Sequence, residues 1–133
     1  MKKRIEAMSR LAKLQARLHV LKLARIAELQ RERAGLSDEL AAVFEALASG
    51  ALAYGAQAKL TSQRPRGIEN QMKALDDVRE ETARQARVHA LRANLVEQAA
   101  EAARRQLRDA NERKALAEIA EQVVARSQDA SLT

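Results

Sequence analysis

Large apolar residues recur three and four positions apart through the first half of the chain, which is the period of one helix face. The spacing slips by one residue between Leu21 and Ile26, and Arg33 falls where an apolar residue is due. The heptad is imperfect at both points, so we expect the supercoil to relax locally. This face comprises Ile5, Met8, Leu11, Leu14, Leu18 and Leu21, followed by Ile26, Leu29, Leu36, Leu40, Val43 and Leu47.

The second half carries a similar face that becomes rich in alanine. It predicts a second long helix from about residue 68 to 128. Residues 129–133 have neither periodicity nor bulk, so we expect a frayed tail there. The face comprises Ile68, Met72, Leu75 and Val78, followed by Val88, Leu91, Leu95, Ala99, Ala102, Leu107, Leu116, Ile119 and Val123.

The only proline of the chain lies close to its midpoint, within residues 63–67. Pro65 cannot donate a backbone hydrogen bond, and it disfavours helical geometry at Arg64. Gly67 permits the positive φ that a reversal often needs. The pattern therefore predicts a first helix over about residues 3–62, a turn over 63–67, and a second helix over about 68–128.

Residues 46–58 hold two glycines among alanines. Gly50 and Gly55 each disfavour a helix interior by about 1 kcal/mol relative to alanine. The surrounding alanines favour the helix, and Leu47, Leu52 and Leu60 offer apolar contacts. We expect a continuous helix, with a break near Gly50 as the alternative.

Two arms of similar length joined by a short turn predict one all-α domain over residues 1–133, a long antiparallel two-helix coiled-coil hairpin. A turn at Pro65 places residues whose numbers add to about 130 opposite each other. Large apolar residues then meet at both ends of the hairpin. The expected pairs are Leu14 with Leu116, Leu11 with Ile119, Ala7 with Val123, Leu36 with Leu95, and Leu52 with Val78.

Composition agrees with long helices rather than with a compact core. The chain is 47% hydrophobic but only 2% aromatic, and it has no tryptophan. It also has no cysteine, which excludes disulfides and thiolate metal sites. Its longest uncharged run, residues 46–58, is shorter than the roughly 20 residues that span a bilayer. We therefore expect a soluble, cytoplasmic protein.

The net charge of +6 is concentrated at one end. Residues 1–27 hold eight bases and one acid, which gives +7, so the remainder of the chain carries −1. Such a block is either a solvated helix face or a surface for an acidic partner. The candidate binding residues are Lys2, Lys3, Arg4, Arg10, Lys13 and Arg17.

No arrangement of residues predicts catalysis. The predicted pairing puts His19 opposite about Asn111 and His89 opposite about Ala41, which separates the two histidines. Neither has carboxylates at metal-ligand spacing. The acidic cluster Asp76, Asp77, Glu80 and Glu81 is typical of a solvated helix face, and no glycine-rich phosphate loop is present. We expect no enzyme activity, no cofactor, no metal and no small-molecule substrate.

Three other classes stay open beside a partner-binding coiled coil. A generic coiled-coil scaffold needs nothing further from the sequence. The basic end could serve nucleic acid, although no aromatic stacking platform or known reader motif accompanies it. Residues 3–29 could lie on a membrane surface, although tryptophan and phenylalanine are missing from their apolar side.

The late segments Ala103–Leu107 and Asn111–Ile119 are charged and leucine-spaced, and they follow a basic first arm and a mid-chain turn. Over most of its length the chain thereby resembles the FliJ/YscO family, the central stalk proteins of flagellar and injectisome type III export ATPases.

The resemblance implies a coiled coil whose basic terminal end enters the pore of a hexameric export ATPase. Its turn end would point to the export gate protein, with Arg64, Arg66, Met72 and Leu75 near the turn as the gate-binding residues. Surface along the helices would meet export chaperones. The implied location is the cytoplasm, at the inner face of the membrane.

Overall fold

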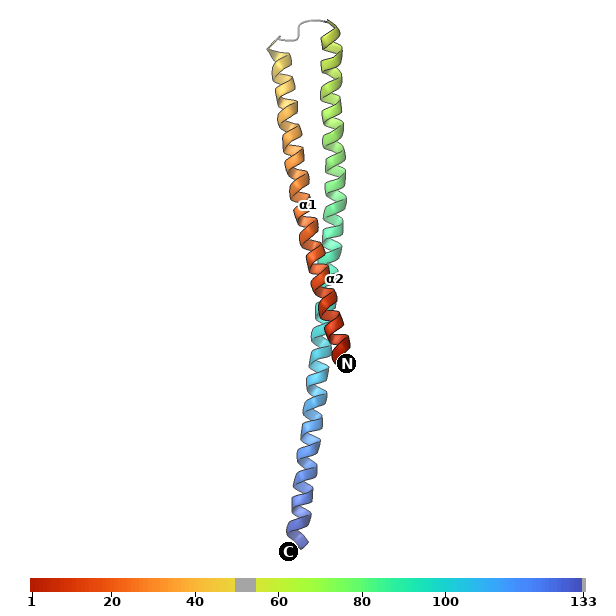
Figure 1. Cartoon of the computed structure of the whole chain (residues 1–133), viewed down its shortest axis with the longest axis vertical. Coiled ribbons are helices and arrows are strands. Elements are labelled where there is room, and N and C mark those ends of the chain that lie inside the picture. The colour runs from red at the N-terminus through yellow and green to blue at the C-terminus, as the bar shows by residue number, and fades with distance from the viewer. Residues whose placement is uncertain (50–54, 133) are drawn as a thin grey trace. The chain divides into compact units, whose positions relative to one another are not determined.

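The computed structural model describes residues 1–49 and 55–132, with side chains for residues 1–49 and 64–130. It has two helices, α1 (Lys2–Ala48) and α2 (Gly55–Leu132), shown in Figure 1. The helices pack against each other in opposite directions, and the described residues contain no strand. This confirms the predicted all-α helical hairpin.

The chain does not reverse at Pro65. Helix α2 begins at Gly55 and runs through residues 63–67 without interruption, so the predicted turn and the predicted arm boundaries are wrong. The reversal lies between Ala48 and Gly55. A helix continuous over 46–58 is therefore also wrong, while the alternative of a break near Gly50 concerns residues outside the described part of the chain.

Packing explains why Pro65 is tolerated inside α2. A proline removes one intrahelical hydrogen bond, but here its ring is buried between the helices. Gly67 has ordinary helical backbone with open space around its Cα, so it supplies no turn. The end of α1 is instead fixed at Ser49, whose hydroxyl donates to the Ala46 carbonyl at 3.0 Å and whose amide donates to the Glu45 carbonyl at 2.9 Å.

The structure divides into two compact units, and each contains part of both helices. Residues 15–91 form the first, which we call the hairpin unit. Residues 1–14 and 92–133 form the second, which we call the terminal unit.

In the hairpin unit the contact line between α1 and α2, here called the seam, follows strict steps of three and four residues. Every seam residue is buried or half-buried. The seam of α1 comprises Gln15, His19, Lys22, Ile26, Leu29, Arg33, Leu36, Leu40 and Val43. The seam of α2 comprises Pro65, Ile68, Met72, Leu75, Arg79, Thr82, Ala86 and His89.

The half of this seam nearer the chain reversal is mainly apolar. Leu29 is 1% exposed and Ile68 is 5% exposed. Arg33 occupies the seam position where the sequence lacks an apolar residue. Its Nε donates to Oδ1 of Asp76 at 2.7 Å, so the charge is paired at the edge of the seam.

The other half of the seam is polar. Nδ1 of His19 lies 2.9 Å from the Ala86 carbonyl oxygen, and Nδ1 of His89 lies 2.7 Å from Oε1 of Gln15. The two histidines therefore lie within about one helical turn of each other, and their predicted separation is wrong. Leu21, which the leucine spacing placed in the seam, is 64% exposed.

The predicted pairing of residues adding to about 130 is also wrong, because the reversal comes earlier in the chain. Residue 19 lies beside 86, and residue 33 lies beside 76. Of the residues expected to pair with α1, Leu116 is 65% exposed, Ile119 is 55% exposed and Val123 is 59% exposed.

In the terminal unit the start of α1 packs on α2 through small and apolar residues. Ile5, Ala12 and Ala100 are buried, and the Arg104 guanidinium donates to the Ser9 hydroxyl. Helix α2 then continues to Leu132, so the frayed tail predicted for residues 129–133 is wrong up to that residue. Thr133 lies outside the described residues.

Candidate partner-binding surfaces

All six predicted basic binding residues are exposed on α1. Five of them, from Lys2 to Lys13, belong to the terminal unit, and Arg17 belongs to the hairpin unit. Lys3, Arg10 and Arg17 recur every seven residues, so they share one face of the helix, turned away from the seam. These cations are free to meet an acidic surface.

Beyond Leu107, no other described segment of the terminal unit covers the side chains of α2 up to Ser127. Residues 108–130 are all exposed, and Figure 1 shows this stretch in blue beyond the N-terminus of α1. We call it the single-helix segment. Steps of three and four residues place Leu116, Ile119 and Val123 on one face of it, each more than half exposed.

The predicted gate-binding residues do not lie beside the chain reversal, because α2 starts at Gly55. Arg64 donates to Oε1 of Glu39 at 3.0 Å, and Arg66 is exposed. Met72 and Leu75 are half-buried seam residues. Two of the four side chains thus contribute to packing between α1 and α2.

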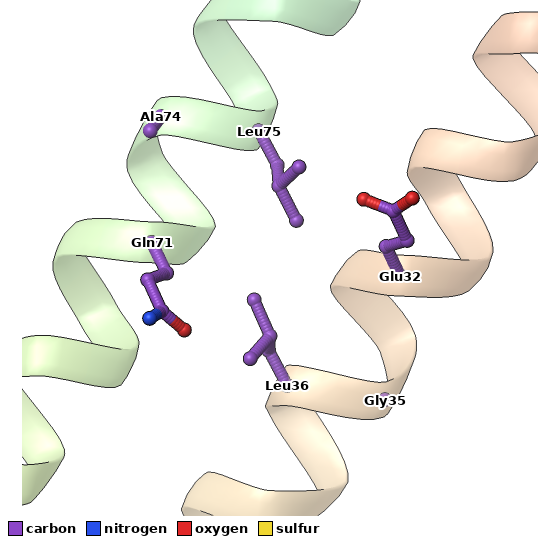
Figure 2. A pocket seen from close by; sticks show the side chains of 6 residues that line it. All are labelled: Glu32, Gly35, Leu36, Gln71, Ala74 and Leu75. Carbon is purple, nitrogen blue, oxygen red and sulfur yellow. The ribbon is translucent and has the colours of Figure 1, made fainter.

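An apolar hollow opens between the helices of the hairpin unit (Figure 2). Its volume is about 550 Å³. Leu36 of α1 and Leu75 of α2 point toward one another across it, and Gly35 and Ala74 lie beside them. A Cβ added at Gly35 would meet nothing within 4 Å. Small residues on both helices therefore leave this space empty.

The hollow lies on one flank of the hairpin unit, which we call the groove flank. Glu32 and Gln71 also line it, and the Glu39–Arg64 ion pair occupies the equivalent positions one heptad nearer the reversal. The opposite flank carries Gln30, Asp76, Glu80 and Ala83. The hollow on the groove flank is lined mainly by apolar and small residues, whereas the hollow on the opposite flank combines Ile26 and Ala83 with four polar or charged side chains.

Two of the four residues in the predicted acidic cluster form ion pairs. Asp76 pairs with Arg33 and lies 3.9 Å from Arg79, and Glu81 pairs with Arg84. Among the residues that the structure describes, no group of three His, Cys, Asp or Glu side chains could hold a metal ion. None of the described helices combines the length and apolarity that a bilayer crossing requires.

Comparison with protein families, with curated proteins and with solved structures finds no match for this chain. Its candidate surfaces are therefore defined by their own geometry and chemistry.

Sequence reasoning found the basic surface but missed the groove flank and the single-helix segment. A signal for the flank was present, because continuing the strict steps from Leu29 and Ile26 toward the start selects Lys22, His19 and Gln15. This series of positions does not include Leu18 or Leu21. The single-helix segment depends on where the chain reverses, and the proline at position 65 pointed to the wrong place.

Proposed function

We propose that this protein is a non-enzymatic coiled-coil stalk or adaptor of a type III protein export apparatus, joining a hexameric export ATPase to the export gate and export chaperones. The family resemblance of the sequence suggests the system. The observation that carries the proposal is the single-helix segment, whose exposed apolar face adjoins no other part of the described terminal unit.

A single helix with an exposed apolar face has little stability of its own in water. Isolated helices are marginally stable, and most helical stability in proteins comes from packing an apolar face. Leu116, Ile119 and Val123 would bury that face inside a partner. The pore of a ring-shaped ATPase offers a surface that surrounds such a helix on several sides.

The basic residues of α1 also favour the terminal unit as the part of the protein that docks into the ATPase. Residues 2–13 of the terminal unit carry five bases and one acid. Charge complementarity with an acidic pore would speed association and orient the helix. It would also make binding depend on salt, because exposed charges are screened within about 8 Å at physiological ionic strength.

The test is recovery of the ATPase from the native cell with tagged protein. Wild type should retain a hexameric export ATPase, and the triple variant Lys3→Glu/Arg10→Glu/Arg17→Glu should lose it while keeping its helicity by circular dichroism. The variant Leu116→Glu/Val123→Glu should lose it as well. A matched control, Arg31→Glu/Lys73→Glu/Arg87→Glu, reverses three exposed charges in the hairpin unit and should retain it.

Two results would count against the proposal. If wild type recovers no ATPase but does recover another protein, the generic scaffold takes its place. If wild type sediments with anionic vesicles and the charge-reversed variant does not, the membrane-surface function takes its place.

A further inference from the structure

We propose that the single-helix segment exchanges between helix and coil in the unbound protein, while the hairpin unit stays folded, and that docking to the export ATPase fixes it as a helix. The exchange follows from the packing and composition of the segment alone. The docking step rests on the proposed function. Together they make the helix content of the unbound segment a determinant of how tightly the protein docks.

Burial does not stabilise the helical form of this segment. Its described residues, 108–130, are all exposed, whereas Leu29 and Ile68 in the hairpin unit are 1% and 5% exposed. Opening the segment therefore breaks backbone hydrogen bonds without uncovering buried apolar surface. Regions with few buried contacts open at a much lower free energy than the core of the same protein. The segment consequently opens on its own, without any change in the seam.

Charged side chains do not replace the missing burial. The ion pair closest to the segment joins Arg108 to Glu101 at 3.8 Å, where the segment begins. Among the described residues, no side chain from Asp109 to Val124 forms an ion pair or a hydrogen bond. The helix over this range is therefore stabilised only by its backbone hydrogen bonds and by the propensities of its residues.

The composition of the segment keeps the helical state populated as well. Alanine has the highest helix propensity of all residues, and the segment contains it repeatedly. The packed part of α2 also supplies a helical nucleus at Leu107, so each closing event avoids the costly nucleation step. Helix and coil are thus close in free energy and interconvert rapidly. The alanines are Ala110, Ala115, Ala117, Ala120, Ala125 and Ala130.

Only the helical state presents a surface for docking. Leu116, Ile119 and Val123 share one face when the segment is helical, and they are dispersed along the chain when it is coil. A partner that binds one of two states has its apparent affinity lowered by the fraction of protein in that state. Substitutions that change helix content away from the apolar face should therefore change the affinity for the ATPase.

Hydrogen exchange on the full-length, unbound protein tests the first half of the inference. Backbone amides of residues 108–130 should exchange on the order of 100-fold faster than those around Leu29, because they are protected only by a local helix. Exchange as slow as in the seam would overturn the inference. This measurement needs no partner, so its result is independent of the proposed function.

Two substitutions away from the apolar face test the second half. Ala125→Gly should speed exchange in the segment and weaken binding to the purified ATPase by up to about fivefold, since glycine disfavours the helix. Asn111→Ala should slow exchange and strengthen binding by up to about threefold. Ala24→Gly is the matched control, because Ala24 is exposed in the hairpin unit. It should leave both quantities at the wild-type value.

The inference is overturned if Ala125→Gly and Asn111→Ala change exchange in the segment but bind the ATPase as wild type does. The affinity of docking would then not depend on helix content. If wild type binds no ATPase, the proposed function fails and the docking half of the inference fails with it. Slow exchange in the unbound segment overturns this inference and leaves the proposed function standing.

Discussion

The half of the hairpin unit nearer the chain reversal and the half farther from it use the same ladder of seam positions but fill it differently. Near the reversal, Leu29 and Ile68 are buried and stabilise the pair by removing apolar surface from water. Farther away, the seam is occupied by hydrogen-bonded histidines. The register is continuous across both halves.

The difference shows that the helical register, rather than local hydrophobicity, can decide which residues lie in the seam. Leu18 and Leu21 are more apolar than His19 and Lys22, yet the latter two lie in the seam. Moving the seam onto the leucines requires a shift of one residue, which turns the helix by about 100°. A helix whose other layers are already in register would have to break its supercoil to follow them. Leu21 consequently stays exposed, and Leu18 is half-buried beside the seam.

The largest expected effect comes from the apolar half. Leu29→Ala should lower the free energy of unfolding by roughly 2–5 kcal/mol, because Leu29 is 1% exposed and its removal leaves a cavity. Leu21→Ala is the matched control and should change stability little, since Leu21 is 64% exposed. Chemical denaturation of both variants checks the contrast. Similar losses from both would mean that the leucine ladder is in the seam.

Substitution in the polar half should have a smaller effect. His89→Ala removes the partner of Gln15 and should cost about 1 kcal/mol, because a half-buried amide loses a hydrogen bond. Replacing both residues, as Gln15→Leu/His89→Leu, should restore or exceed wild-type stability. If the double variant is less stable than the single one, the Gln15–His89 pair contributes more to stability than its hydrogen bond alone.

A third substitution should raise the stability of the protein rather than lower it. Gly67→Ala should stabilise α2 by up to about 1 kcal/mol, since Gly67 lies in the helix interior and a Cβ there meets nothing within 4 Å. The expected readout is a rise of a few degrees in melting temperature. A loss of stability would indicate that the backbone at Gly67 turns after all, as the sequence alone suggested.

The smallest effect is expected at the edge of the apolar half. Arg64→Ala removes the exposed ion pair with Glu39, whose atoms lie 3.0 Å apart, and should cost less than about 1 kcal/mol. The loss should shrink as salt is added, because exposed charges are screened. A cost that persists in high salt would show that the arginine stem contributes packing.

Periodicity was sufficient to predict the hairpin and much of its seam. Ile26, Leu29, Leu36, Leu40 and Val43 were assigned to the correct face, and the irregularity at Arg33 was correctly placed. The turn was not predictable from Pro65, because a buried proline ring can offset a lost backbone hydrogen bond. Since the register follows from the turn, the predicted cross-helix pairs between described residues shifted with it, while the pair of Leu52 with Val78 involves a residue outside the described part of the chain.

The candidate surfaces were less accessible to sequence reasoning. Charge density identified Lys3 and Arg10 as exposed without any knowledge of the fold. The hollow on the groove flank could not be predicted from the sequence, because Gly35 and Ala74 line one surface only when two distant segments pair. Leu116 was recognised as apolar, but its exposure follows only from the length by which α2 exceeds α1.

The antiparallel register also has a consequence for the order of folding. In the hairpin unit the Glu39–Arg64 contact joins residues 25 apart, whereas the Gln15–His89 contact joins residues 74 apart. Closing the longer loop first would cost roughly 1 kcal/mol more in chain entropy. Once the layers near the reversal have formed, each further layer brings only a few residues together. The pair should therefore zip from the reversal toward the histidines, and the histidine layers should be the first to open when the protein unfolds.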